Sequence, residues 1–139
     1  MRPKNALAAM VVTMIAAAGL ATGAAAQMRE AVTPQFKHEL PNVPGKSLTS
    51  VVVEYAPGAR SVSHRHAKSA FIYAYVLAGA VRSQVDDGPP TIYRAGESFF
   101  EMPGAHHRMS ENASSTEPAR LLAVFVSDTG ERLTTPDQP

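Results

Sequence analysis

The chain contains no cysteine among its 139 residues. This absence excludes disulfides, thiolate catalysis, iron–sulfur clusters and a lipid-bearing cysteine. Any metal ligands must therefore come from histidine, aspartate, glutamate or the backbone. A protein without disulfides must be stabilised by packing, by a bound metal or by a second subunit.

The chain also lacks a marked excess of positive or negative charge. Lysine and arginine number 13, aspartate and glutamate number 12, and the formal net charge is only +1. No run of like charges follows the first few residues. We therefore expect neither nucleic acid nor an anionic membrane surface as a partner. The length is typical of a single domain.

Residues 1–26 have the three-part layout of a secretory signal peptide. Arg2 and Lys4 form a basic start, residues 7–20 are apolar and uncharged, and three alanines ending at Ala26 give an A-x-A cleavage pattern. The alternative is a membrane anchor, which needs roughly 20 apolar residues. The high content of alanine, glycine and threonine favours cleavage after Ala26. This predicts a periplasmic or secreted bacterial protein that has no membrane contact after cleavage.

The rest of the chain indicates an all-β domain. Glycine and proline separate short apolar or alternating segments, which predict eight strands at residues 48–56, 61–66, 71–77, 81–85, 91–93, 98–101, 106–110 and 120–126. Many short strands without a convincing helix are typical of a sandwich or a closed barrel. The barrel is expected over residues 48–127.

The segments on either side of the predicted barrel lack strand patterns. Residues 27–47 contain Pro34, Pro41 and Pro44 and are expected to form an irregular arm lying against the domain. The polar residues 128–139 are expected to form a flexible tail.

Four of the five histidines fall in two close groups, His64 with His66 and His106 with His107. Residues two apart on a strand project from the same face, so His64 and His66 form a natural two-point metal chelate. A histidine from a later strand can complete the set if that strand lies alongside. The alternative is a metal-free barrel with ordinary surface histidines, because an H-x-H pair alone is a weak signal.

Both histidine groups lie in patterns that resemble the two motifs of the cupin superfamily. The first motif is matched by Gly58, five further residues, His64-Arg65-His66 and a later Gly79. The second motif is matched by Gly96, five further residues, then Met102-Pro103-Gly104-Ala105-His106-His107. The resemblance covers residues 48–126 and implies a double-stranded β-helix, or jelly-roll barrel. It further implies one divalent metal (iron, manganese, zinc, nickel or copper) on His64, His66 and His107, and a homodimer.

Three positions depart from these motifs. The metal-binding glutamate of the first motif corresponds to Ile72, which cannot bind a metal. Met102 replaces a proline, and Glu111 stands at an asparagine position, with Asn112 one residue later. A one-residue insertion would account for the last difference. Three neutral imidazoles would leave the metal charge unneutralised and favour an anionic or carbonyl-bearing ligand. Glu101 could supply a carboxylate as a fourth ligand or a catalytic base, or it could be an outward polar residue.

Strand alternation predicts which further residues face the barrel interior. If the register continues beyond His66, Ile72, Ala74 and Val76 face inward, while Tyr73 and Tyr75 face the other layer or a partner subunit. The candidates for contact with a small-molecule substrate are Arg82, Gln84 and Tyr75. We expect His106 to be outward or supporting, and His38 to be solvated.

Three functional hypotheses follow. The first is a metal-dependent enzyme acting on a small oxygenated molecule. Its chemistry would be dioxygenase-like with iron or copper, and hydrolysis or isomerisation with zinc, nickel or manganese. The second is a non-catalytic cupin module that binds a small ligand or a metal, which Ile72 favours. The third is the metal-free barrel.

Overall fold

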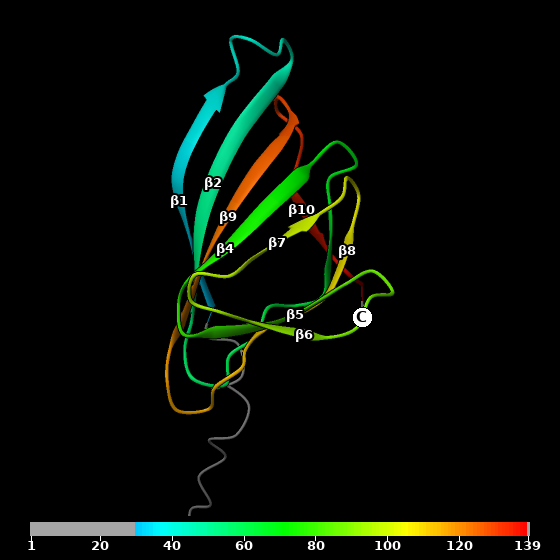
Figure 1. The fold of residues 1–139 in the computed structure, drawn as a ribbon. Helices are drawn as coiled ribbons and strands as arrows, with labels where there is room; N and C mark the ends of the chain where they lie inside the picture. Colours follow the sequence, from blue (N-terminus) through cyan, green and yellow to red (C-terminus); the bar gives the residue numbers. More distant parts are fainter. Residues whose placement is uncertain (1–29, 139) are drawn as a thin grey trace, which may run out of the picture.

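The computed structural model describes residues 30–138, in which ten antiparallel strands form two facing five-stranded sheets (Figure 1). The first sheet has the order β1 (Glu30–Glu39), β2 (Lys46–Tyr55), β9 (Ala119–Asp128), β4 (Phe71–Ala78) and β7 (Ser98–Glu101). The second has the order β10 (Thr134–Pro136), β3 (His64–His66), β8 (His106–Asn112), β5 (Ala80–Val85) and β6 (Thr91–Arg94).

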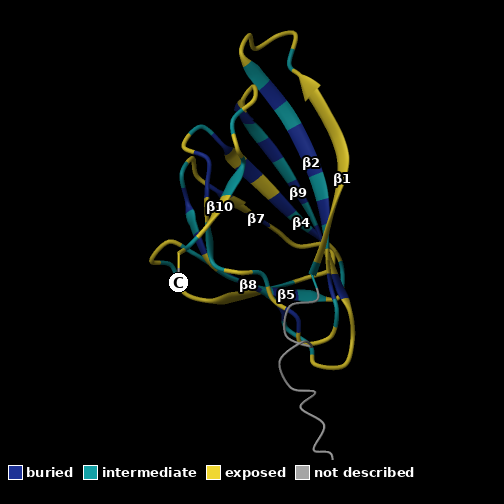
Figure 2. Cartoon of the chain, turned by 180° about the vertical axis from the view of Figure 1, so that it is seen from behind, coloured by how far each residue is buried: buried dark blue, intermediate teal, exposed yellow. Residues whose placement is uncertain are grey.

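The predicted all-β fold is confirmed, and each of the eight predicted strands has a counterpart from β2 to β9. The predicted alternation on β4 is also correct, because Ile72, Ala74 and Val76 are buried while Tyr73 is exposed. Figure 2 shows the same banding on β2 and β9, which alternate between buried and less buried positions. On β4 and β9 the buried side chains line the space between the sheets, whereas β2 lines it with Tyr55 and the less buried Val51 and Val53.

The structure differs from the sequence prediction at both ends of the barrel. Residues 30–39 of the expected irregular arm form β1, which pairs with β2 and bulges between Pro34 and Phe36. Pro34 is tolerated because β1 is an edge strand, where a missing N–H removes no interior hydrogen bond. Residues 134–136 of the expected flexible tail form β10, which pairs with β3.

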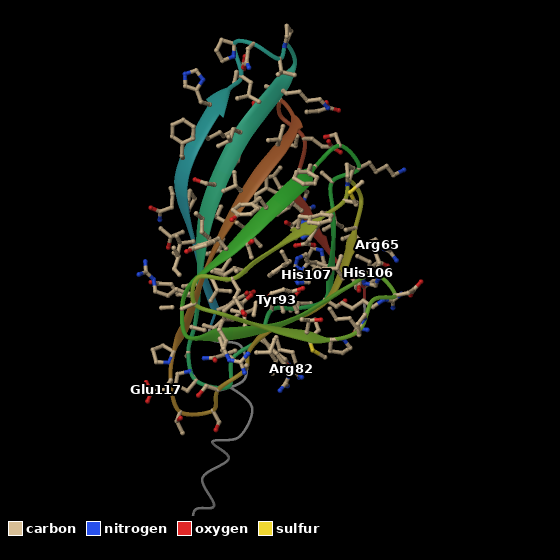
Figure 3. The ribbon with its side chains drawn as sticks, viewed as in Figure 1. Arg65, Arg82, Tyr93, His106, His107 and Glu117 are labelled. Atoms are coloured by element: carbon tan, nitrogen blue, oxygen red, sulfur yellow. The ribbon has the colours of Figure 1, made fainter. Side chains whose placement is uncertain are left out.

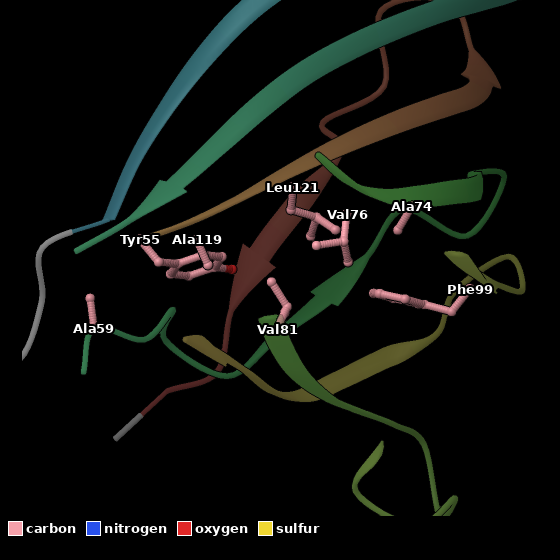
Figure 4. Close-up of a cluster of buried hydrophobic side chains, with 8 residues drawn as sticks. All are labelled: Tyr55, Ala59, Ala74, Val76, Val81, Phe99, Ala119 and Leu121. Carbon is pink, nitrogen blue, oxygen red and sulfur yellow. The ribbon is translucent and has the colours of Figure 1, made fainter. Parts of the chain in front are cut away.

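Small side chains dominate the interior. Figure 4 shows the larger buried cluster between the sheets, which comprises Tyr55, Ala59, Ala74, Val76, Val81, Phe99, Ala119 and Leu121. A second cluster comprises Ala67, Ala70, Ile72, Ala123 and Phe125. Because alanine fills little volume, the two inner faces leave room between them for a cavity.

A close backbone approach explains one motif glycine. Gly79 connects β4 to β5 with a positive φ of 69°, and a Cβ atom there would lie 2.4 Å from the Pro118 carbonyl oxygen. Only glycine fits this position without displacing the backbone.

No helix in the described part of the chain is long and apolar enough to cross a membrane. The signal peptide predicted over residues 1–26, its cleavage after Ala26 and the alternative membrane anchor lie outside the described residues. They stay predictions.

Candidate metal centre

His64, His66 and His107 converge at one end of the space between the sheets. Strands β3 and β8 are neighbours, and His64 lies directly opposite His107 in their register. The ring centroid of His64 lies 4.8 Å from the ring centroid of His66 and 5.2 Å from that of His107. The centroids of His66 and His107 are 5.9 Å apart. The predicted convergence of the three imidazoles is therefore confirmed.

The donor atoms of this cluster fit a divalent metal ion. One ligand atom from each histidine lies within 4.8 Å of the other two. Two nitrogens bound to one zinc ion are at most about 4.2 Å apart, so small side-chain rotations would close the set on an ion. Buried Nε2 of His66 and Oε2 of Glu101 lie 3.1 Å apart but form no well-directed hydrogen bond among the described residues. Buried polar atoms are normally paired, and a metal ion between these two would satisfy both.

Surrounding groups hold each imidazole in place. The Nδ1–H of His64 donates to the Val62 carbonyl at 2.7 Å, and Nδ1 of His66 lies 3.4 Å from the Leu133 carbonyl. Nε2 of His107 is hydrogen-bonded to the Ser83 hydroxyl at 2.8 Å. Such contacts fix the ring orientation of metal-binding histidines. Sequence reasoning missed Ser83, although its alternation with buried Val81 could have identified it as inward-facing.

Glu101 faces the histidines from β7. Its side chain is only 3 % exposed, which excludes the alternative of an outward polar residue. Oε2 lies 3.1 Å from His66 Nε2, and Oε1 lies 3.4 Å from His107 Nδ1. In the β4–β7 register Glu101 stands directly opposite Ile72, the position of the motif carboxylate. Opposed residues on one face have Cβ atoms about 5 Å apart, so the two strand positions reach the same region.

The electrostatic environment favours neutral imidazoles beside an ionised carboxylate. Burial lowers the pKa of the His107 imidazole to about 4, against the opposing effect of Glu101. Burial also lowers the pKa of His64. For Glu101, burial acts to raise the pKa, but the interaction with His66 and the nearby His107 outweigh it, so the pKa is lowered. Neutral imidazole and ionised carboxylate are the forms that bind metals.

A bulge in β8 explains the displaced asparagine of the second motif. The β5–β8 register shifts between Gln84 and Val85, which leaves Arg108 without a partner. The inward positions of β8 are consequently His107, Ser110 and Asn112. The extra residue in this bulge accounts for the one-residue offset of Asn112 from the motif position. Asn112 is buried and donates to the carbonyls of Ala56 and Glu117, where it holds the loop before β9.

The histidine cluster opens into a cavity of about 370 Å³ between the sheets. Its walls are largely apolar and come mainly from β2, β4 and β9, with Val51, Val53, Ile72, Ala74, Leu121, Ala123 and Phe125. The two terminal strands complete it, because β1 contributes Glu30 and Val32 while β10 contributes Thr134 and Pro136.

The three candidate substrate contacts lie elsewhere. Arg82 pairs with Glu111 at 2.8 Å, and Figure 3 shows it pointing away from the space that holds His107. Gln84 donates to the Gly88 carbonyl, and Tyr75 takes an outward position on β4. None of the three lines the cavity. Neighbours on a strand face opposite ways, so inward-facing Ser83 places Arg82 and Gln84 on the other face.

The two remaining histidines lie outside the cluster. His106 contacts the C-terminal segment, with its Nε2 2.6 Å from Asp137 Oδ2. His38 lies on β1 and is exposed, as predicted.

Comparison with known proteins supports this fold. A family model described as a cupin domain matches residues 51–125. No curated protein matches the chain. An RmlC-like cupin family protein with a double-stranded β-helix fold from Methanocaldococcus jannaschii is 12% identical with a TM-score of 0.58, covering 71% of this chain and 81% of that chain.

Two enzymes share the fold with similar TM-scores. Oxalate oxidase in complex with the substrate analogue glycolate is 24% identical with a TM-score of 0.56, covering 70% of this chain and 51% of that chain. A DMSP lyase structure is 19% identical with a TM-score of 0.59, covering 79% of this chain and 53% of that chain. The chain spans about half the length of these two enzymes.

Proposed function

Because this chain belongs to the cupin family, whose model covers both histidine groups, we propose that it is an exported, metal-dependent enzyme acting on a small oxygenated molecule. The proposed metal is one divalent ion held by His64, His66 and His107, with the carboxylate of Glu101 as fourth ligand. The observation that carries the proposal is the convergence of these donors, with His66 and Glu101 almost fully buried, at one end of a cavity.

The residues in and around the cavity have different proposed roles. A divalent metal would supply Lewis-acid polarisation of a bound oxygen and, if it is iron or copper, oxygen activation. Ser83 orients His107, and Val62 orients His64 through its carbonyl. Ile72 and Phe125 keep water from the apolar side of the cavity and orient the carbon skeleton of a substrate.

Two observations support a small oxygenated substrate. The cavity volume of about 370 Å³ suits a small molecule. Glu101 neutralises only one of the two positive charges of the proposed metal, so an anionic or carbonyl oxygen is the favoured additional ligand. Among enzymes with this fold, the oxalate oxidase structure contains glycolate, a molecule of this class.

The proposal is tested on protein purified without a histidine tag. We expect about one equivalent of a divalent metal per chain by elemental analysis, as one site requires. The metal-loaded protein should then transform at least one member of a panel of small carboxylic acids and carbonyl compounds, with oxygen uptake recorded beside product analysis. Metal-free protein is the control. Absence of bound metal after loading would contradict the proposed centre.

A non-catalytic binding module is the second candidate. The cavity-lining residues with titratable side chains are Glu30, Tyr55, Glu101 and the three histidines. If Glu101 and the histidines all bind the metal, no carboxylate remains beside the metal to act as a general base. Stoichiometric metal with tight ligand binding, but without turnover across the panel, would favour this candidate.

We further propose that the protein forms a homodimer through the outer face of β4 and β7. Phe71 and Phe100 stack there with ring centroids 5.9 Å apart, and Phe100 lies opposite Tyr73 in the strand register. Phe100 is 61% exposed, and the outward positions of the two strands carry no charge. An uncharged apolar face is self-complementary, because no like charges meet across a twofold axis.

Replacing Phe100 with glutamate should convert the dimer into a monomer, because it places two like charges in an apolar contact. Light scattering coupled to gel filtration at micromolar concentration measures the mass. Ile92→Glu, an equally drastic change on exposed β6 of the other sheet, is the matched control and should stay dimeric. A monomeric parent protein, or two variants with the same mass, would contradict this interface.

A further inference from the structure

A second polar cluster lies in the cavity, built from residues that the metal centre does not use. The buried Tyr55 hydroxyl lies 2.7 Å from the Ser110 hydroxyl and 2.9 Å from the Ser61 hydroxyl. Ser61 in turn donates to Oε2 of Glu30. All four residues line the cavity, and they come from β2, the β2–β3 connection, β8 and β1.

The hydrogen bonds of this cluster run in one direction. Each hydroxyl has a single hydrogen, and Ser61 uses its own toward Glu30. Ser61 must therefore accept from Tyr55, and Tyr55 must accept from Ser110. Burial raises the pKa of Tyr55 to about 12, so its hydroxyl keeps the hydrogen that this order needs. This series of hydrogen bonds, called the relay below, runs from Ser110 through Tyr55 and Ser61 to the Glu30 carboxylate. The carboxylate can accept further hydrogen bonds.

The cavity therefore presents opposite chemistry at its two polar sites. At one site, a divalent metal and Glu101 would leave a net positive charge that attracts an oxyanion. At the other, the hydrogens of the relay are committed and the Glu30 carboxylate can only accept. Apolar side chains, including Val53 and Leu121, also line the cavity. A donor bound by Glu30 is better a hydroxyl than an ammonium, because stripping water from a charge is far costlier.

We propose that the ligand of this cavity is an aliphatic hydroxy acid, with its carboxylate directed to the metal centre and its distal hydroxyl donating to Glu30. This inference rests on the proposed metal function and adds the substrate class. Glu30 and Tyr55 are then the residues that select the hydroxyl. A ligand ending in a methyl group would cover the half-buried Glu30 carboxylate and leave it with Ser61 as its one donor in this cluster, which disfavours that ligand.

The test compares straight-chain carboxylic acids of four to eight carbons with their terminal-hydroxyl analogues, on cobalt-loaded protein. Calorimetry gives each Kd, and the visible absorption of cobalt reports whether the carboxylate reaches the metal. We expect the best-fitting hydroxy acid to bind about tenfold more tightly than the unsubstituted acid of equal length, since hydrogen bonds to charged groups are the stronger class.

Glu30→Gln should reduce this affinity ratio at least threefold, and Tyr55→Phe should reduce it by breaking the relay that orients Ser61. Circular dichroism checks that both variants are folded. Glu39→Gln, on the same strand but outside the cavity lining, is the matched control and should keep the parent ratio.

A ratio near one in the parent protein, or the parent ratio in both folded variants, would overturn the assignment of the hydroxyl subsite. Cobalt loading is measured first, so that failure of the metal centre can be distinguished from failure of the hydroxyl subsite. Protein that does not take up cobalt contradicts the metal centre and this inference with it. Cobalt-loaded protein without a hydroxyl preference contradicts this inference alone.

Discussion

Replacing His64 and His107 together with alanine should abolish stoichiometric metal binding. The change removes two of the three imidazoles whose ligand atoms lie within 4.8 Å of one another. Loss of one group that merely supports a ligand costs about 10- to 100-fold in metal affinity, so loss of two ligands should cost at least about 100-fold. Elemental analysis after dialysis against a weak chelator measures the retained metal, and circular dichroism confirms that the variant is folded.

The matched control removes the same number of histidines. His38→Ala with His106→Ala takes away one exposed ring on β1 and one that contacts Asp137, neither of which belongs to the cluster. This control variant should retain about one metal per chain. If the His64/His107 variant retains as much metal as the control, the metal binds elsewhere and the proposed centre is wrong.

Replacing Glu101 with glutamine should weaken metal binding at least tenfold while preserving the shape of the side chain. The carboxylate oxygens lie 3.1 Å from His66 and 3.4 Å from His107, and loss of their charge removes the anion that faces these two imidazoles. The expected size follows from the cost of losing a supporting group, about 10- to 100-fold, which a direct ligand should equal or exceed. Competition with a chromophoric chelator measures the affinity.

Turnover separates the two roles considered for Glu101. Unchanged metal affinity with strongly reduced turnover would show that Glu101 is a base and not a ligand. Glu111→Gln is the control, because this glutamate pairs with Arg82 outside the cavity. A sharper variant exchanges the two opposed side chains as Ile72→Glu/Glu101→Ile. Because the positions face each other across β4 and β7, the exchange should recover much of the lost affinity.

Much of the fold was predictable because strand signals are local. The eight inner strands follow from alternating apolar residues and from glycine and proline at the turns, and each is present between β2 and β9. The faces of β4 were predictable for the same reason, since Ile72, Ala74 and Val76 are all buried. The terminal strands were not predictable in this way. Strand β1 is mostly exposed and contains Pro34, so it lacks an apolar alternation.

The cavity residues were harder to predict than the histidines. Arg82 and Gln84 are candidates from the sequence because they lie on the strand paired with residues 71–77, but the side chains of a strand alternate and Ser83 takes the inward position. Glu30 and Tyr55 lie far apart in the sequence and carry no motif. They belong to one network only because β1 pairs with β2 and Ser61 links the two side chains.

The amino-acid sequence alone determined the strand pattern, the chelating spacing of His64 and His66, and the absence of a motif carboxylate at Ile72. These properties depend on neighbours in the chain, and the two-residue period of a strand makes them readable. Only the tertiary structure decided that Glu101 faces His66 from another strand, and that β1 and β10 complete the cavity. Those contacts depend on register between distant segments, which the local pattern does not specify.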